Sequence, residues 1–198
     1  MIPRNLVITV VLMLVVAVAM GVYLARMRHR ATQIGAASAS ARPVAPPVSG
    51  PAEQVTLFVA YDDPGMLRAQ SVKLRLSAGR QERMQDLLRA LIGVYLDKDS
   101  PHRLAPGSDI RDAYLVDPGL AVIDLNAAFA NGHQSGVLVE ELTVASFIET
   151  LSANVPGITR VKFLVDGKLR ETLAGHANLS QFYDVATAGE MLSKLTQP

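Results

Sequence analysis

The chain has 198 residues, no cysteine and a formal net charge of +1, which excludes disulfides and thiolate metal sites and suits one ordinary domain with additions. The charge is uneven. Residues 1–50 hold five arginines and no acid, so residues 51–198 keep 14 basic and all 18 acidic groups, a net charge of −4. A mildly acidic domain lacks the basic surface that nucleic-acid binding requires, so we expect no nucleic-acid partner.

The chain begins with an apolar run long enough to span a bilayer. Leu6 to Ala25 contains no charged residue, and only Thr9 and Gly21 interrupt it. A helix over this run rises about 30 Å, the thickness of the hydrocarbon core. We therefore predict a membrane anchor over residues 1–30, with one transmembrane helix at about 6–25. The residues assigned to this anchor are Leu6, Val7, Ile8, Val16, Val22 and Leu24.

Cleavage and orientation of this segment stay open. Ala17-Val-Ala19 is a small-residue site suited to signal-peptide cleavage, but apolar residues continue through Leu24, which favours an uncleaved anchor. Arg26, Arg28 and Arg30 follow the run, and the positive-inside rule places that flank in the cytoplasm. The spacer and folded domain that come next are instead typical of an exported, tethered module.

Residues 31–53 read as a linker rich in Ala, Ser and Pro, with too little apolar surface to offset the entropy of ordering. The domain is predicted over residues 54–184. It opens with β-branched and aromatic residues typical of a strand at Val55–Tyr61, and alternation predicts a second strand at Val72–Leu76.

A first helix is predicted from about Arg80, because six apolar residues recur at three- and four-residue steps. They are Met84, Leu87, Leu88, Leu91, Ile92 and Tyr95. Two strands, Ile110–Val116 and Leu120–Leu125, follow around a Pro-Gly turn.

The second helix is predicted from about Ser135 to Asn154, with apolar residues inward. Three acids are expected to face solvent, Glu140, Glu141 and Glu149. Strands at Val161–Val165 and Lys168–Leu173 then flank Asp166-Gly167, a two-residue hairpin signal. Residues 185–198 form a tail with a short helical stripe.

The predicted order is therefore β-β-α-β-β-α-β-β, preceded by the transmembrane helix. Helices separated by hairpins argue for an α+β fold. We expect one mostly antiparallel sheet with both helices packed on one face.

The histidines offer no metal site by spacing. His29, His102, His133 and His176 are far apart in sequence, and cysteine is absent. We interpret His133 as a solvated loop residue and His176 as a residue whose side chain closes its loop.

The aspartates offer neither a calcium site nor an acid–base pair by their pattern. Asp97, Asp99 and Asp109 lack the glycine and glutamate of a calcium-binding loop. Asp62 and Asp63 could serve as an acid–base pair, but beside Pro64-Gly65 they fit turn residues that bind backbone amides.

Asp124 lies inside a predicted strand and is given a structural role, on the open face of the sheet or as a cap of the next turn. No nucleophile elbow and no glycine-rich phosphate loop occurs in the sequence. We therefore assign no catalytic residue, no metal ligand and no cofactor, and the interaction residues stay unknown.

Short motifs in a fixed order resemble the GerMN family, named for sporulation and spore germination, over residues 55–183. The motifs are Asp86-Leu-Leu-Arg-Ala-Leu-Ile-Gly93, Leu104-Ala-Pro-Gly107, Val122-Ile-Asp-Leu125 with Phe129, Thr150-Leu151, Pro156-Gly157 with Val161, and Val165-Asp-Gly-Lys168. The sequence departs from the family at Gly93, which Val94 follows in place of proline, and it carries one such domain.

The resemblance implies a bacterial, membrane-tethered module that lies outside the cytoplasm and has no known catalytic residues. Members of the family are implicated in assembling envelope complexes, so the resemblance implies that the partner is an envelope protein or a cell-wall component. It also implies a position at the bacterial inner membrane, and it leaves the oligomeric state open. Our primary hypothesis is a single-pass, non-enzymatic interaction protein of the cell membrane. The alternatives are a ligand-sensing domain and a cell-wall hydrolase.

Overall fold

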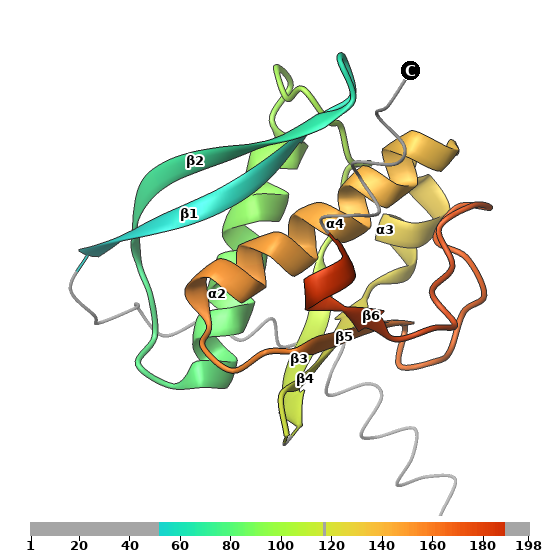
Figure 1. Cartoon of the computed structure of the whole chain (residues 1–198). Coiled ribbons are helices and arrows are strands. Elements are labelled where there is room, and N and C mark those ends of the chain that lie inside the picture. Colours follow the sequence, from blue (N-terminus) through green and yellow to red (C-terminus); the bar gives the residue numbers. More distant parts are fainter. Residues whose placement is uncertain (1–51, 117, 189–198) are drawn as a thin grey trace, which may run out of the picture. The chain divides into compact units, whose positions relative to one another are not determined.

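The computed structural model describes residues 52–116 and 118–188 of the chain (Figure 1). The predicted anchor at 6–25, most of the linker and the end of the tail lie outside the described residues. Within the described part, no helix is long and apolar enough to cross a membrane. The single-pass anchor therefore stays a prediction from the sequence.

The described residues form two sheets and three helices, and residues 185–188 form a further helical turn. In chain order the strands and the three helices are β1 (Ala52–Tyr61), β2 (Met66–Arg75), α2 (Arg80–Leu96), β3 (Ile110–Val116), β4 (Leu120–Leu125), α3 (Ala127–Gly132), α4 (Val137–Asn154), β5 (Arg160–Val165) and β6 (Tyr183–Asp184). One sheet holds β1 and β2, and the other has the order β3-β4-β5-β6. The α+β class is confirmed, whereas the prediction of a single sheet is wrong.

The first sheet is a long hairpin. β1 and β2 pair antiparallel over ten residues each, from Ala52↔Arg75 to Tyr61↔Met66. Gly65, at φ 83°, provides the left-handed conformation that the turn between them needs. β2 begins six residues before the predicted Val72, because the polar residues of Met66–Ser71 hide its start from an alternation rule.

The second sheet is mixed. β4 pairs antiparallel with β3 but parallel with β5, from Leu120↔Arg160 to Leu125↔Val165. A parallel pair needs a crossover, and α3 and α4 supply it between β4 and β5. The mostly antiparallel arrangement predicted from the sequence is therefore wrong at this pair.

The turn after β5 has the predicted chemistry but not the predicted strand. Asp166 and Gly167 both have positive φ, 51° and 72°, as a two-residue hairpin turn requires. Beyond them only one isolated bridge, Val165↔Lys168, continues the pairing. The last strand of the sheet is the two-residue β6, which pairs antiparallel with β5.

The two long helices lie between the sheets, not on one face of a single sheet (Figure 1). The six apolar residues predicted for the first helix are the buried residues of α2. α4 contacts both layers: Thr150 Oγ1 accepts a hydrogen bond from Phe58 N of β1 at 2.9 Å, and Phe147 contacts Phe163 of β5. A helix in this position is buried on most sides, which explains its weak amphipathic pattern.

Helix side chains close the outer edge of β1. The N–H groups of Thr56, Phe58 and Ala60 donate to Asn154 Oδ1, Thr150 Oγ1 and Tyr95 OH, at 3.1, 2.9 and 2.9 Å. Each buried amide of that edge thus gains a partner without a neighbouring strand. The hairpin is held by α2 and α4 through these bonds as well as by apolar packing.

Four aromatic rings join the helices to the second sheet. Phe129, Phe147, Phe163 and Tyr183 follow one another with centroid distances of 5.7, 6.3 and 5.8 Å. All four side chains are at most 2% exposed. The row connects α3, α4, β5 and β6, so it closes the core around the crossover.

Replacing Phe147 by alanine should lower the free energy of unfolding by about 4 kcal/mol, because it leaves a cavity in this row. Phe182→Ala is the matched control, since Phe182 is 55% exposed and its loss should change stability little. Urea denaturation of the full chain in detergent, followed by circular dichroism, measures both. Equal effects of the two changes would contradict the assignment of this core.

Candidate interaction site

One buried polar cluster joins two histidines through a threonine hydroxyl. His102 Nε2 and His133 Nε2 each lie 2.7 Å from Thr143 Oγ1, and His102 Nδ1 lies 2.6 Å from Asp62 Oδ1. Both rings and the hydroxyl are less than 10% exposed. The sequence interpretation of His133 as a solvated residue is wrong, because Thr143 on α4 lies against its ring. Asp62 does follow β1 at the turn, but its carboxylate binds His102 rather than a backbone amide.

The protons of this cluster are partly fixed by its acceptors. Gln134 O can only accept, so His133 Nδ1, 2.7 Å away, carries a proton. Burial lowers the pKa of His133, which favours the neutral ring. Val139 O, 3.0 Å from Thr143 Oγ1, can also only accept, so it and His133 Nε2 compete for the single hydroxyl proton of Thr143.

The order Asp62, His102, Thr143 resembles a nucleophile with its base and orienting acid. Thr143 Oγ1, however, has both imidazoles at 2.7 Å and Val139 O at 3.0 Å, and the residue is 2% exposed. A nucleophile must reach the substrate carbonyl, and no side of this oxygen is free to do so. The geometry fits a polar tie between the β1–β2 turn, the segment after α2, and α4.

A second polar centre is Glu140, in the first turn of α4. Its Oε2 accepts from the N–H groups of Ala174, His176 and Ala177, each at 2.9 Å, and its Oε1 lies 2.9 Å from His176 Nδ1. The side chain is fully buried, so the prediction that Glu140 faces solvent is wrong. The prediction that His176 closes its loop through a side-chain bond is confirmed.

The pKa of Glu140 reflects two opposed effects. Burial alone raises it, but the hydrogen bonds from Ala174, His176 and Ala177 outweigh burial and lower it to about 2. A carboxylate that accepts several backbone N–H groups is stable only in its charged form. Glu140 is therefore an ionised anchor for residues 174–177, not an acid that exchanges protons near neutral pH.

Two further charges bind backbone groups of turns. Asp124 is 5% exposed and its Oδ1 accepts from Gly167 N at 2.8 Å, so it has a structural role, although not on an open face and not as a cap of the next turn. That cap is Asn126, which accepts from Phe129 N. Lys162, 6% exposed, donates Nζ to Leu179 O and Ser180 O at 2.7 and 2.6 Å.

The other candidate aspartates lie in the loops between helices and strands. Asp97 Oδ1 accepts from Asp99 N at 2.9 Å, and Asp109 Oδ1 accepts from Ile110 N at 2.8 Å. Asp63 is exposed beside Pro64. Among residues 52–116 and 118–188, no three His, Asp or Glu side chains are grouped as ligands of a metal ion.

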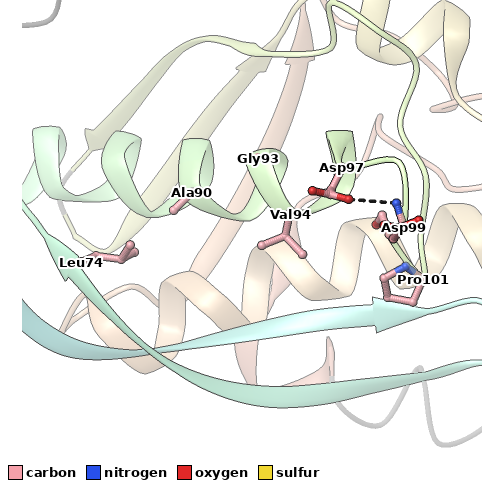
Figure 2. A pocket seen from close by; sticks show the side chains of 8 residues that line it. Leu74, Ala90, Gly93, Val94, Asp97, Asp99 and Pro101 are labelled. Atoms are coloured by element: carbon pink, nitrogen blue, oxygen red, sulfur yellow. Dashed lines mark hydrogen bonds between the residues drawn. The ribbon is translucent and has the colours of Figure 1, made fainter.

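An open groove lies between the hairpin and α2 (Figure 2). Its volume is 530 Å³, and its apolar lining comes from Leu74 of β2, from Ala90, Gly93 and Val94 of α2, and from Pro101. Asp97, Asp99 and Ser100 line one end. No member of the Asp62, His102 and Thr143 cluster lines it. Sequence reasoning missed this groove, because it depends on how far the hairpin stands from the helix.

The comparisons with known proteins agree with this fold. The family model Germane, described as sporulation and spore germination, matches residues 56–171, more than half of the chain. The chain belongs to this family. The predicted resemblance to GerMN domains is thereby confirmed. No curated protein sequence matches the chain.

Solved GerMN domains share this fold at low identity. The first GerMN domain of the sporulation protein GerM from Bacillus subtilis is 19% identical with a TM-score of 0.50, covering 67% of this chain and 97% of that domain. The tandem GerMN domains of the same protein are 16% identical with a TM-score of 0.51, covering 68% of this chain and 46% of that chain. A protein from Clostridium perfringens is 16% identical with a TM-score of 0.46, covering 71% and 91%.

Glu140→Gln should lower the free energy of unfolding by about 3 kcal/mol, because three amides that now share a carboxylate oxygen lose a charged acceptor. Glu141→Gln is the control. Its Oε2 has no hydrogen-bond partner, and burial followed by the nearby Glu140 raises its pKa. Neutralising Glu141 should therefore leave stability unchanged or higher. A larger loss for Glu141→Gln than for Glu140→Gln, in urea denaturation, would contradict this account.

The stability difference between the native chain and His133→Gln should shrink as the pH falls from 7.5 to 5.5. Burial holds the folded-state pKa of His133 below 6.5, so the unfolded chain binds the proton first and acid favours unfolding. At pH 5.5, one unit below 6.5, the resulting loss of stability is at most about 1.4 kcal/mol. Urea denaturation across that range measures it, and a difference independent of pH would refute the neutral state of His133.

Proposed function

We propose that the chain is a non-catalytic interaction module of the bacterial envelope, held at the inner membrane by its N-terminal segment. The observation that carries the proposal is the contrast between the buried polar groups of the domain and its open groove. The buried groups that resemble catalytic residues are fully engaged with one another. The open groove beside α2, in contrast, has a mainly apolar lining, and Asp97, Asp99 and Ser100 lie at one end of it.

Membership of the sporulation and germination family supports an envelope role, and the apolar run at 6–25 supports tethering. A tethered domain gains effective concentration toward partners at the same membrane, so modest affinity suffices. We place the domain outside the cytoplasm, in keeping with its spacer. The partner is an envelope protein or a cell-wall component.

Site-specific photo-cross-linking of the full chain in the cells that produce it tests this proposal. Cross-linkers at the exposed positions Val137, Leu169 and Phe182 should trap a defined envelope protein or wall polymer, identified by mass spectrometry. The control is the same set of positions in a chain lacking residues 1–30, which should trap less because tethering is lost. Capture of cytoplasmic proteins alone would contradict the orientation.

The enzymatic alternative has its own decisive result. Purified full chain should leave cell-wall polymer undigested, and Asp62→Asn should change stability only. Digestion that Asp62→Asn abolishes would establish a hydrolase and end the proposal of a non-catalytic module.

A further inference from the structure

The hairpin has one closed edge and one edge without a neighbouring strand. In β1, the N–H groups of Thr56, Phe58 and Ala60 bind helix side chains, so they point away from β2. Backbone groups alternate in direction along a strand. Val55 and Leu57 therefore direct their N–H and C=O groups toward β2.

The register then fixes the direction of the β2 groups. Val72 and Gln70 lie opposite Val55 and Leu57 and must face β1. The residues of β2 that alternate with them direct N–H and C=O to the other side, away from β1. They are Leu67, Ala69, Ser71 and Lys73. Within the described residues no strand pairs with that side of β2, so it presents a regular row of donors and acceptors.

The groove meets β2 at Leu74, next to Lys73 of this free edge. Leu74 of β2 forms one wall, and Ala90, Gly93 and Val94 of α2 form the other (Figure 2). The helix wall is made of small side chains, and a Cβ added at Gly93 would meet nothing within 4 Å. A third strand on β2 would therefore have room for its inward side chains over α2.

The charge of β2 indicates which kind of segment can bind at its free edge. β2 carries Arg68, Lys73 and Arg75 and no acid, and all three are exposed. A second copy of β2 would bring the same basic residues to the edge, and like charges on adjacent strands are unfavourable. The fitting occupant alternates apolar residues, which enter the groove, with acidic residues, which lie beside Lys73 on the outer face.

The acidic end of the groove sets a limit on this occupant. Asp97 and Asp99 line the groove together with Pro101. Pro101 O accepts a hydrogen bond from Asp62 N at 3.2 Å, so this end of the groove lies near the β1–β2 turn. Lys73 and Arg75 lie at the other end of the hairpin. The acids of the occupant should therefore gather toward the Lys73 end.

We propose that the groove between β2 and α2 binds an extended, alternating apolar and acidic segment of a partner protein, which adds to β2 as a third strand. This inference rests on the proposed interaction function and specifies its site. Main-chain bonds to β2 supply affinity, and the groove and Lys73 supply selectivity.

The test uses the full chain in nanodiscs and two capped seven-residue peptides, one alternating valine with glutamate and one alternating valine with lysine. Fluorescence anisotropy should give the glutamate peptide about tenfold higher affinity. Lys73→Glu should reverse that order. Equal affinities for the two peptides would overturn the proposal.

Two matched variants separate strand addition from attraction by charge alone. Ser71→Pro removes one free-edge N–H but no backbone bond to β1, and should weaken binding about tenfold. Ser71→Ala should not, although both variants lose the hydrogen bond from Gln54 Nε2 to Ser71 Oγ. Gly93→Leu should fill the groove and weaken binding similarly, while the open space at Gly93 leaves the fold intact. Urea denaturation verifies folding of each variant. Equal binding by Ser71→Pro and Ser71→Ala would refute strand addition.

The oligomeric state supplies another decisive outcome. A dimer that Ser71→Pro dissociates would mean that a second copy occupies the edge, and would overturn the choice of partner. If photo-cross-linking traps an envelope partner but the two peptides bind equally, the proposed envelope function is supported and the proposed binding site is refuted.

Discussion

Helix α4 imposes the constraint on which the rest of the domain depends. It lies between two sheets, so polar side chains on almost every side of it are removed from water and must find partners inside the protein. Glu140 gains backbone amides of residues 174–177, Thr143 gains two imidazoles, and Thr150 gains an amide of β1. The first two ties fix loop segments that have little secondary structure of their own, and the third holds strand β1.

The same constraint explains why two groups that resemble reactive centres lack an open side for a substrate. A catalytic side chain must keep one hydrogen-bonding direction for its substrate. Other groups of the protein occupy the hydrogen-bonding directions of the Thr143 hydroxyl and of the Glu140 carboxylate. These hydrogen bonds therefore contribute to the stability of the fold. What remains open is main chain, along β2, beside an apolar groove. Recognition through backbone and shape is the chemistry that such a surface offers.

The sequence predicted what depends on local pattern. The stripe of α2, the turn at Asp166-Gly167 and the closing of its loop by His176 were all readable, since each depends on spacing or on residues close in sequence. Prediction from the sequence failed for the features that depend on long-range packing. Glu140 looks exposed by composition, and only the fold brings residues 174–177 onto its carboxylate. The parallel pairing of β4 and β5, and the groove, likewise depend on how far apart elements pack.

The asymmetry of the hairpin has a consequence for assembly. A sheet with two open edges is a template that can propagate, chain upon chain, into a fibre. Here Asn154, Thr150 and Tyr95 already occupy the amides of β1, so growth on that side is blocked at its first step. Strands can therefore add to this hairpin only on the β2 side, so a chain of copies cannot grow from both edges of this sheet.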